Sequence, residues 1–204
     1  MNKKMFMVTI LAILLVSAII GFLYYEATPN YNVSILNVSS VYSLNNSTLE
    51  KLNINKDVTI NHESNTIYDN NSYSTMLIEA SPMWYYNKSA PSEFFLLYDT
   101  VNPTIILHKG SEIKFILVNM DDMTHNLAIV NYAPPYNYMP YMSMMGNNHD
   151  IMMNSPMLNP MNEATHTYNA ITIVLKFNTA GTLWYICVYP GHAQVGMYGK
   201  IIVV

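Results

Sequence analysis

The sequence predicts an all-β sandwich preceded by one N-terminal transmembrane helix. Two observations indicate this: an uncharged run lies near the N-terminus, and short runs rich in β-branched and aromatic residues dominate the chain from residue 76 onward. Charged residues make up only 11% of the 204 residues, the formal net charge is −4, and arginine is absent. Because such a chain lacks a basic surface, nucleic acid is excluded as a partner.

The first predicted element is a membrane anchor. The run Met5–Tyr25 is uncharged and follows Lys3 and Lys4. At about 1.5 Å per residue, a helix of this length spans the roughly 30 Å hydrocarbon core of a bilayer. Because lysines favour the cytoplasmic side, residues 1–4 are predicted to be a cytoplasmic tip, and the chain after the helix is predicted to face outward. A cleaved signal peptide is the alternative, but the run exceeds a usual h-region and no A-x-A site follows it.

Residues 26–75 form a polar segment rich in Asn, Ser and Thr. It is either an extension or the first strands of the domain, since "VTINHES" and "YSTMLIEAS" alternate well enough to be strands. N-x-[ST] sequons crowd this part of the chain, which fits an exported and glycosylated face. The sequons begin at Asn32, Asn37, Asn45, Asn46, Asn70 and Asn87.

Residues 76–204 carry mostly strand signals and form the predicted domain. "PTIILHKGSEIKFILVNMDD" predicts two β-runs around a Lys-Gly turn. "HNLAIVNY", "HTYNAITIVLKFN", "TLWYICVY" and "GKIIVV" follow, with Gly, Pro and Asn between them. Several short strands separated by turns indicate a β-sandwich or barrel.

The only cysteine, Cys187, points to a metal. It lies in "TLWYICVYPGHAQVGMYGKIIVV", where His192 and Met197 follow at equal intervals between two strand-like runs. A lone cysteine is most often a small buried hydrophobe, and it cannot form an intrachain disulfide. The Cys-x4-His-x4-Met spacing favours a metal instead, because a His₂Cys set with a long axial Met describes a blue-copper centre. We therefore predict one type 1 copper ion.

Such a centre requires a second histidine from elsewhere in the chain. His125 is favoured, because it follows a turn in "NMDDMTHNLAIV" and heads an apolar strand. His108 lies beside a turn in "KGSE", and His62 lies in the polar segment. His166, at the start of a strand, and His149, in a Met-rich stretch, remain alternatives with less apolar context.

Two stretches of the sequence resemble a known family. "KGSEIKFILVNMDDMTHNLAIV" resembles the first ligand region of cupredoxins. "AGTLWYICVYPGHAQVGMYGKIIVV" resembles the C-terminal ligand loop of sulfocyanin and, more loosely, that of rusticyanin. The resemblance covers roughly residues 90–204. It implies a Greek-key β-sandwich with one type 1 copper, and one-electron transfer in the respiratory chains of acid-loving archaea. Carried over by position, the copper ligands are His125, Cys187, His192 and Met197.

The resemblance and the neighbouring residues assign further roles. In cupredoxins the position of Asn126 commonly steadies the two ligand loops by hydrogen bonding. His192 follows a Pro-Gly pair, so we expect its ring edge to reach the surface within an apolar patch, as the point where electrons enter and leave. Three aromatic residues are expected to wall the site or pack in the core: Trp184, Tyr185 and Tyr189.

One loop stands apart from the strands. Half of the 16 methionines lie in residues 139–161, among prolines and asparagines that predict a long loop. Methionine side chains adapt to partners, so the loop is a candidate docking surface. It also supports the alternative function, an extracytoplasmic copper-binding or copper-delivery protein.

The favoured function is an electron carrier, not an enzyme. Multicopper oxidases and nitrite reductases need further histidine clusters, and no H-x-H pattern occurs; a binuclear copper subunit needs two cysteines. A hydrolase using Cys187 and His192 lacks an orienting partner. The family implies a cytochrome or an iron-oxidising system as donor and a terminal oxidase as acceptor. The low charge content fits an acidic exterior, where protonated carboxylates hold no ion pairs.

Overall fold

The computed structural model describes residues 15–17, 31–85, 87–140 and 150–204. The chain divides into two units, residues 1–30 and Tyr31–Val204. The predicted anchor lies outside the described residues except for residues 15–17, which are helical. Within the described ranges, no helix is long and apolar enough to cross a membrane.

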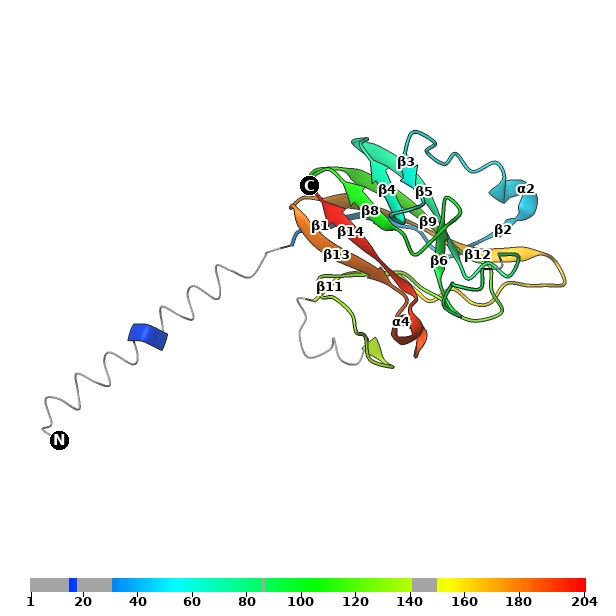
Figure 1. Cartoon of the computed structure of the whole chain (residues 1–204). Coiled ribbons are helices and arrows are strands. Elements are labelled where there is room, and N and C mark those ends of the chain that lie inside the picture. The colour runs from blue at the N-terminus through cyan, green and yellow to red at the C-terminus, as the bar shows by residue number, and fades with distance from the viewer. Residues whose placement is uncertain (1–14, 18–30, 86, 141–149) are drawn as a thin grey trace, which may run out of the picture. The chain divides into compact units, whose positions relative to one another are not determined.

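The described residues from Tyr31 to Val204 form two β-sheets packed face to face, which confirms the predicted all-β sandwich (Figure 1). The first sheet has the order β1-β12-β9-β5-β6-β7, and β2 also pairs with β12. Its strands are mostly antiparallel, but β5 and β9 are parallel. Their bounds are Val33–Val38 (β1), Tyr42–Asn45 (β2), Tyr73–Ala80 (β5), Phe95–Leu97 (β6), Thr100–Val101 (β7), Glu112–Asn119 (β9) and Thr167–Phe177 (β12).

The second sheet has the order β11-β10-β13-β14-β8-β4-β3. In it β8 runs parallel to both β14 and β4. The bounds are Thr59–Asn61 (β3), Thr66–Asp69 (β4), Thr104–Leu107 (β8), Ala128–Val130 (β10), Ile151–Asn154 (β11), Gly181–Ile186 (β13) and Tyr198–Val203 (β14). The single-turn helices α2 (Asn46–Leu49) and α4 (His192–Val195) lie outside the two sheets.

The core lies between the two sheets. Alternate residues of β5 and β9 point inward, so Met76 and Phe115 are buried against Leu183 and Ile201 of the opposite sheet. Each such side chain contributes roughly 1.5–3 kcal/mol by leaving water. This packing fixes the positions of the strand ends from which the site is built.

The polar segment before residue 76 supplies strands to both sheets. β1 and β2 pair with β12, while β3 and β4 extend the second sheet. The two runs expected around the Lys-Gly turn, β8 and β9, lie in different sheets. The chain crosses between the sheets at Gly110, whose φ of 90° suits glycine, and its N–H donates to the carbonyl of Phe177 at 2.7 Å.

The prediction of an unbroken loop over residues 139–161 is wrong in one part. Ile151–Asn154 form β11, which pairs with β10 and places Met153 opposite Ile129. Met153 is thereby buried in the core. Pairing with an available strand edge outweighs a local composition rich in turn residues. Residues 141–149 lie outside the described part of the chain.

Candidate metal centre

The C-terminal loop closes on itself between β13 and β14, with α4 at that end of the sandwich (Figure 1). Cys187 directly follows β13, His192 begins α4, and Met197 directly precedes β14. The N–H of Cys187 donates to the carbonyl of Met197 at 3.2 Å, and the N–H of Met197 donates to the carbonyl of His192 at 2.9 Å. Gly191 and Gly196 flank α4 with φ of 88° and 119°, which glycine adopts without strain.

His125 reaches the same place from the chain before β10. Its N–H donates to the carbonyl of Leu158 at 3.2 Å, and the N–H of Leu158 donates back at 2.7 Å. β10 pairs with β13 so that Ala128 lies opposite Ile186. This register brings His125 beside Cys187.

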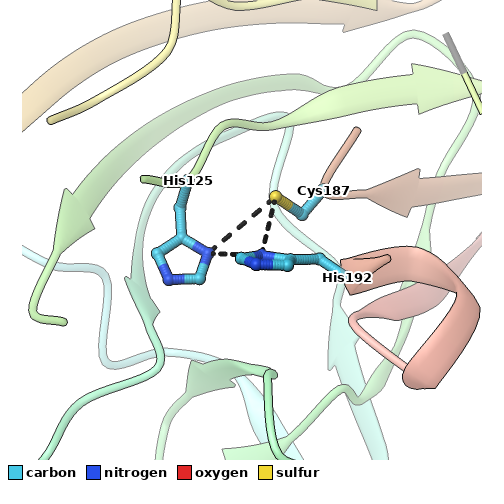
Figure 2. A group of neighbouring side chains, drawn as sticks. All are labelled: His125, Cys187 and His192. Atoms are coloured by element: carbon cyan, nitrogen blue, oxygen red, sulfur yellow. Dashed lines mark hydrogen bonds between the residues drawn. The ribbon is translucent and has the colours of Figure 1, made fainter. Parts of the chain in front are cut away.

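The side chains of His125, Cys187 and His192 point toward one another (Figure 2). Their exposed fractions are 0%, 0% and 3%. The sulfur lies 3.9 Å from Nδ1 of His125 and 3.6 Å from Nδ1 of His192, and the two nitrogens are 3.1 Å apart. A point equidistant from the three atoms lies about 2.1 Å from each, close to ordinary metal–nitrogen and metal–sulfur bond lengths of about 2.0–2.3 Å. The three atoms therefore fit a single metal ion.

Met197 belongs to the same buried cluster as Cys187 and is 0% exposed. Its backbone is hydrogen-bonded to the backbones of Cys187 and His192. The thioether of Met197 would supply the weak fourth ligand of a His₂Cys centre.

Asn126 links the two ligand segments. Its Oδ1 accepts a hydrogen bond from the N–H of Val188 at 2.9 Å. Its Nδ2 donates to Oδ1 of Asn154 at 2.8 Å and to the carbonyl of Ser155 at 3.3 Å. The side chain is fully buried, so it joins the chain after His125, the chain after Cys187 and β11.

The outer nitrogen of His125 faces two carboxyl groups that the sequence analysis missed. Nε2 lies 2.8 Å from Oδ2 of Asp121 and 3.6 Å from Oε2 of Glu93. Burial alone would raise the pKa of Asp121, but the hydrogen bond with His125 holds it below its usual range. Burial and the charge of Asp121 raise the pKa of Glu93, against a hydrogen bond from Ser81 at 2.9 Å. Asp121 is therefore the ionised partner of His125.

Burial sets the protonation of the triad. It raises the pKa of Cys187 to about 12, although backbone hydrogen bonds from Asn126 and Tyr189 lower it in part. It lowers the pKa of His192 to about 4, and the neighbouring His125 lowers it further. His192 is thus kept neutral for metal binding, while the thiolate needs a positive ion to form.

The ring edge of His192 does not reach the surface, so that expectation is wrong. Nε2 is buried and has no hydrogen-bond partner among the described residues. The ring of Tyr189 packs 4.6 Å from the imidazole, centroid to centroid. Of the other two aromatic residues, Tyr185 is buried in the core, and Trp184 is partly buried with the ammonium of Lys200 4.9 Å from its ring.

The other described histidines lie away from the triad. His62, His108 and His166 are exposed. Nε2 of His108 lies 3.2 Å from the side-chain oxygen of Asn70, and no described metal-ligating group includes any of the three. His149 lies outside the described residues. Among the described candidates for the second histidine, only His125 lies beside the cysteine.

The protein family to which the chain belongs is shown by a match that covers the strands from β6 to β14. A model of copper-binding proteins of the plastocyanin/azurin family matches residues 92–204. The chain belongs to this family. It is a cupredoxin, and members of this family carry electrons. The broader family resemblance seen in the sequence is thereby confirmed.

The relatives of this cupredoxin include rusticyanins. Rusticyanin from Acidithiobacillus ferridurans is 31% identical over 115 residues, 55% of this chain and 56% of the relative. A rusticyanin from Acidithiobacillus ferrooxidans is 31% identical over 114 residues and is covered to 68%. The chain thus matches just over half the length of the first of these curated relatives.

Solved rusticyanin structures share the fold. Reduced rusticyanin at 1.9 Å superimposes with a TM-score of 0.63 over 81% of this chain and all of that one, at 23% identity. Rusticyanin from Thiobacillus ferrooxidans at 1.27 Å gives a TM-score of 0.62 over 81% of this chain and 98% of that one, at 22% identity.

The predicted cofactor, a type 1 copper ion, is confirmed by the family and the buried donor set together. His125, Cys187, His192 and Met197 would hold the copper ion. Thiolate and thioether are soft ligands, and imidazole suits copper, so the chemistry of the set agrees with the geometry.

Proposed function

We propose that this cupredoxin is a membrane-anchored electron carrier of the sulfocyanin type. It serves the respiratory chain of an acidophilic archaeon, between an upstream donor and a terminal oxidase. The observation that carries the electron-transfer role is the buried triad of His125, Cys187 and His192. When bound there, copper supplies a one-electron Cu(I)/Cu(II) couple.

The ligands are held by rigid structure, which suits electron transfer. His125 is fixed by paired backbone hydrogen bonds, and the loop from Cys187 to Met197 is closed by its own. Because the strands on both sides restrain the ligands, their positions need not change between the two oxidation states. A small change in geometry permits fast transfer.

The scarcity of ion pairs supports an acidic setting. Among the described residues, no lysine lies within ion-pair distance of a carboxylate, and the only close contacts of this kind are those of the His125 imidazole with Asp121 and Glu93. Acid therefore has few paired carboxylates to neutralise when it protonates this fold. The low pKa of His192 adds to this, because the ligand stays neutral down to a pH of about 4.

An apolar surface beside His192 supports docking of a redox partner. Val195 of α4 is 51% exposed. Tyr138 is 60% exposed, and its carbonyl accepts a hydrogen bond from the N–H of Gly191 at 2.7 Å. We propose that the electron passes between His192 and the partner on this side of the molecule. A cytochrome or an iron-oxidising component is the donor in this proposal.

The membrane part of the proposal rests on the uncharged run Met5–Tyr25 behind two lysines. The full chain is expected to float with liposomes and to resist carbonate extraction. A variant lacking residues 5–25 is expected to stay in the aqueous fraction. Full recovery of the complete chain in the aqueous fraction would contradict the anchor.

The test of the copper centre is the visible spectrum of the full chain loaded with Cu(II), beside Cys187→Ser. We expect an intense blue copper–thiolate band that the variant lacks. The wild type should exchange electrons reversibly and retain its copper when a copper-binding chelator of moderate strength is added. A colourless protein that releases copper would overturn the carrier and favour copper delivery by the Met-rich loop.

A further inference from the structure

One of the two copper-binding histidines has its outer nitrogen hydrogen-bonded and the other does not. Nε2 of His125 lies 2.8 Å from Oδ2 of Asp121, whereas Nε2 of His192 is buried with no partner among the described residues. A neutral imidazole carries its proton on only one nitrogen. Nδ1 of His125 can bind a metal only if it carries no proton, so the proton must be on Nε2. A carboxylate that accepts a hydrogen bond from Nε2–H stabilises this tautomer.

The carboxylate of Asp121 is itself fixed in place. Its Oδ1 accepts the N–H of Asp122 at 2.8 Å, and its own N–H donates to Oδ1 of Asn119 at 3.1 Å. The amide of Asn119 donates to the carbonyls of Met123 and Leu158 at 2.7 and 3.1 Å. These hydrogen bonds fix the turn before His125 to the segment around Leu158, whose backbone pairs with that of His125.

We propose that Asp121 is a positioning residue of the copper site. It holds the Nε2–H of His125, turns Nδ1 toward Cys187 and His192, and makes that nitrogen a stronger donor to Cu(II). The proposal deepens the copper site described above and rests on the proposed function only for its effect on the reduction potential. A carboxylate behind a ligating histidine raises the basicity of the ligand. Asp121 therefore stabilises Cu(II) and lowers the potential.

Two donors face Asp121, so the residue must offer two acceptor oxygens. The N–H of Asp122 points to Oδ1 and Nε2 of His125 points to Oδ2, so an amide in this orientation meets one of them with its oxygen and the other with its NH₂ group. If its NH₂ group turned to Nε2, it would favour the tautomer with the proton on Nδ1, which opposes metal binding. Asp121→Asn is thus a disruptive change despite its similar shape.

Glu93 has a smaller role. Its Oε2 lies 3.6 Å from Nε2 of His125, beyond hydrogen-bond distance, and accepts instead from the hydroxyl of Ser81 at 2.9 Å. The two acids near the histidine are therefore not equivalent. Glu93→Gln should change copper affinity less than Asp121→Asn does.

The experiment compares the full chain with Asp121→Asn, Asp121→Glu and Glu163→Gln. Glu163 is exposed, so its variant removes one charge without touching the site. Nitrogen-15 NMR of the metal-free, histidine-labelled proteins reports each tautomer. We expect wild-type His125 in the Nε2–H form, with His192 showing no such preference. Copper titration and voltammetry follow on the same samples.

In Asp121→Asn we expect His125 to lose that preference and Cu(II) affinity to fall about 10–100-fold. The potential should rise by about 59 mV for each tenfold loss of Cu(II) affinity relative to Cu(I). Asp121→Glu should restore part of the tautomer preference and part of the Cu(II) affinity. Glu163→Gln should leave the tautomer preference and the affinity unchanged. An unchanged tautomer and affinity in Asp121→Asn, or equal effects in Glu163→Gln, would overturn the proposal.

Should Asp121→Asn fail to fold, as judged by circular dichroism, the wild-type tautomer decides. His125 found with its proton on Nδ1 would overturn the positioning role, and the Nε2–H form together with partial rescue by Asp121→Glu would support it. A chain that binds copper without a blue band would overturn the proposed function alone, because the tautomers are measured without metal.

Discussion

The side-chain oxygen of Asn126 accepts a hydrogen bond from the backbone N–H of Val188 at 2.9 Å. The residue after the first histidine is thus tied to the residue after the cysteine, although the two are far apart in the chain. Both groups are buried, so neither can turn to water if the other is removed. This hydrogen bond holds together the two segments that carry the copper ligands.

Replacing Asn126 by Ala should therefore destabilise the fold and loosen the site. It leaves the N–H of Val188 and the side chain of Asn154 without their partner, at a cost of about 1–3 kcal/mol. Denaturant unfolding of the metal-free chain measures this cost, and copper titration should show weaker binding. Asn53→Ala, at an exposed position, is the control. Equal stability of the two variants would contradict the bridging role.

Replacing the axial residue should move the potential in a direction set by the new side chain. Met197→Leu removes a weak donor, which harms Cu(II) more than Cu(I) and raises the potential. Met197→Gln supplies a harder oxygen donor and lowers it. A tenfold change in relative affinity corresponds to about 59 mV, and shifts on that order are expected by voltammetry. Shifts of the same sign in both variants would rule out Met197 as the axial ligand.

The three ligands that lie close together in sequence could be predicted, because the Cys-x4-His-x4-Met spacing is typical of a copper-binding loop. Cys187, His192 and Met197 lie in one loop between two strands. His125 could be chosen because it heads an apolar strand. Asp121 lies four residues before His125 in the chain. Nothing near His125 in sequence points to Glu93, which reaches it only through the order of strands in the first sheet.

Tertiary packing explains what the sequence analysis missed. β11 forms because β10 offers it an edge, and the residues themselves favour turns. β8 and β9 share one turn yet do not pair with each other, because β9 pairs with β12 in the first sheet and β8 pairs with β14 in the second. The burial of His192 depends on the packing of Tyr189 and the loop around it, which no local pattern encodes.

A buried tyrosine anchors the strand that leads to the cysteine. The hydroxyl of Tyr185 donates to the carbonyl of Pro103 at 2.6 Å, and its ring fills the space that a side chain at Gly199 would need. Tyr185→Phe should cost about 1–2 kcal/mol, because it leaves that carbonyl unpaired. Thermal unfolding measures the loss, with the exposed Tyr73→Phe as control. A loss of the same size in the control would show that the hydrogen bond contributes nothing.

The chain should gain stability in acid through Glu79, which faces Tyr98 and Asp99 from β5. Burial, together with the charge of Asp99, raises the pKa of Glu79 from 4.5 to about 7. Between pH 4.5 and 7 the folded chain therefore binds a proton that the unfolded chain has lost, so stability falls as the pH rises through this window.

Glu79→Gln removes this effect, since an amide does not titrate. We expect the variant to be more stable than the wild type at pH 7 and to have similar stability at pH 4, because the wild-type residue is uncharged there. Denaturant unfolding of the metal-free proteins at both values measures the difference, and the exposed Glu63→Gln is the control. A gain that is equal at both pH values would mean that the change acts through packing, and the raised pKa would then play no part.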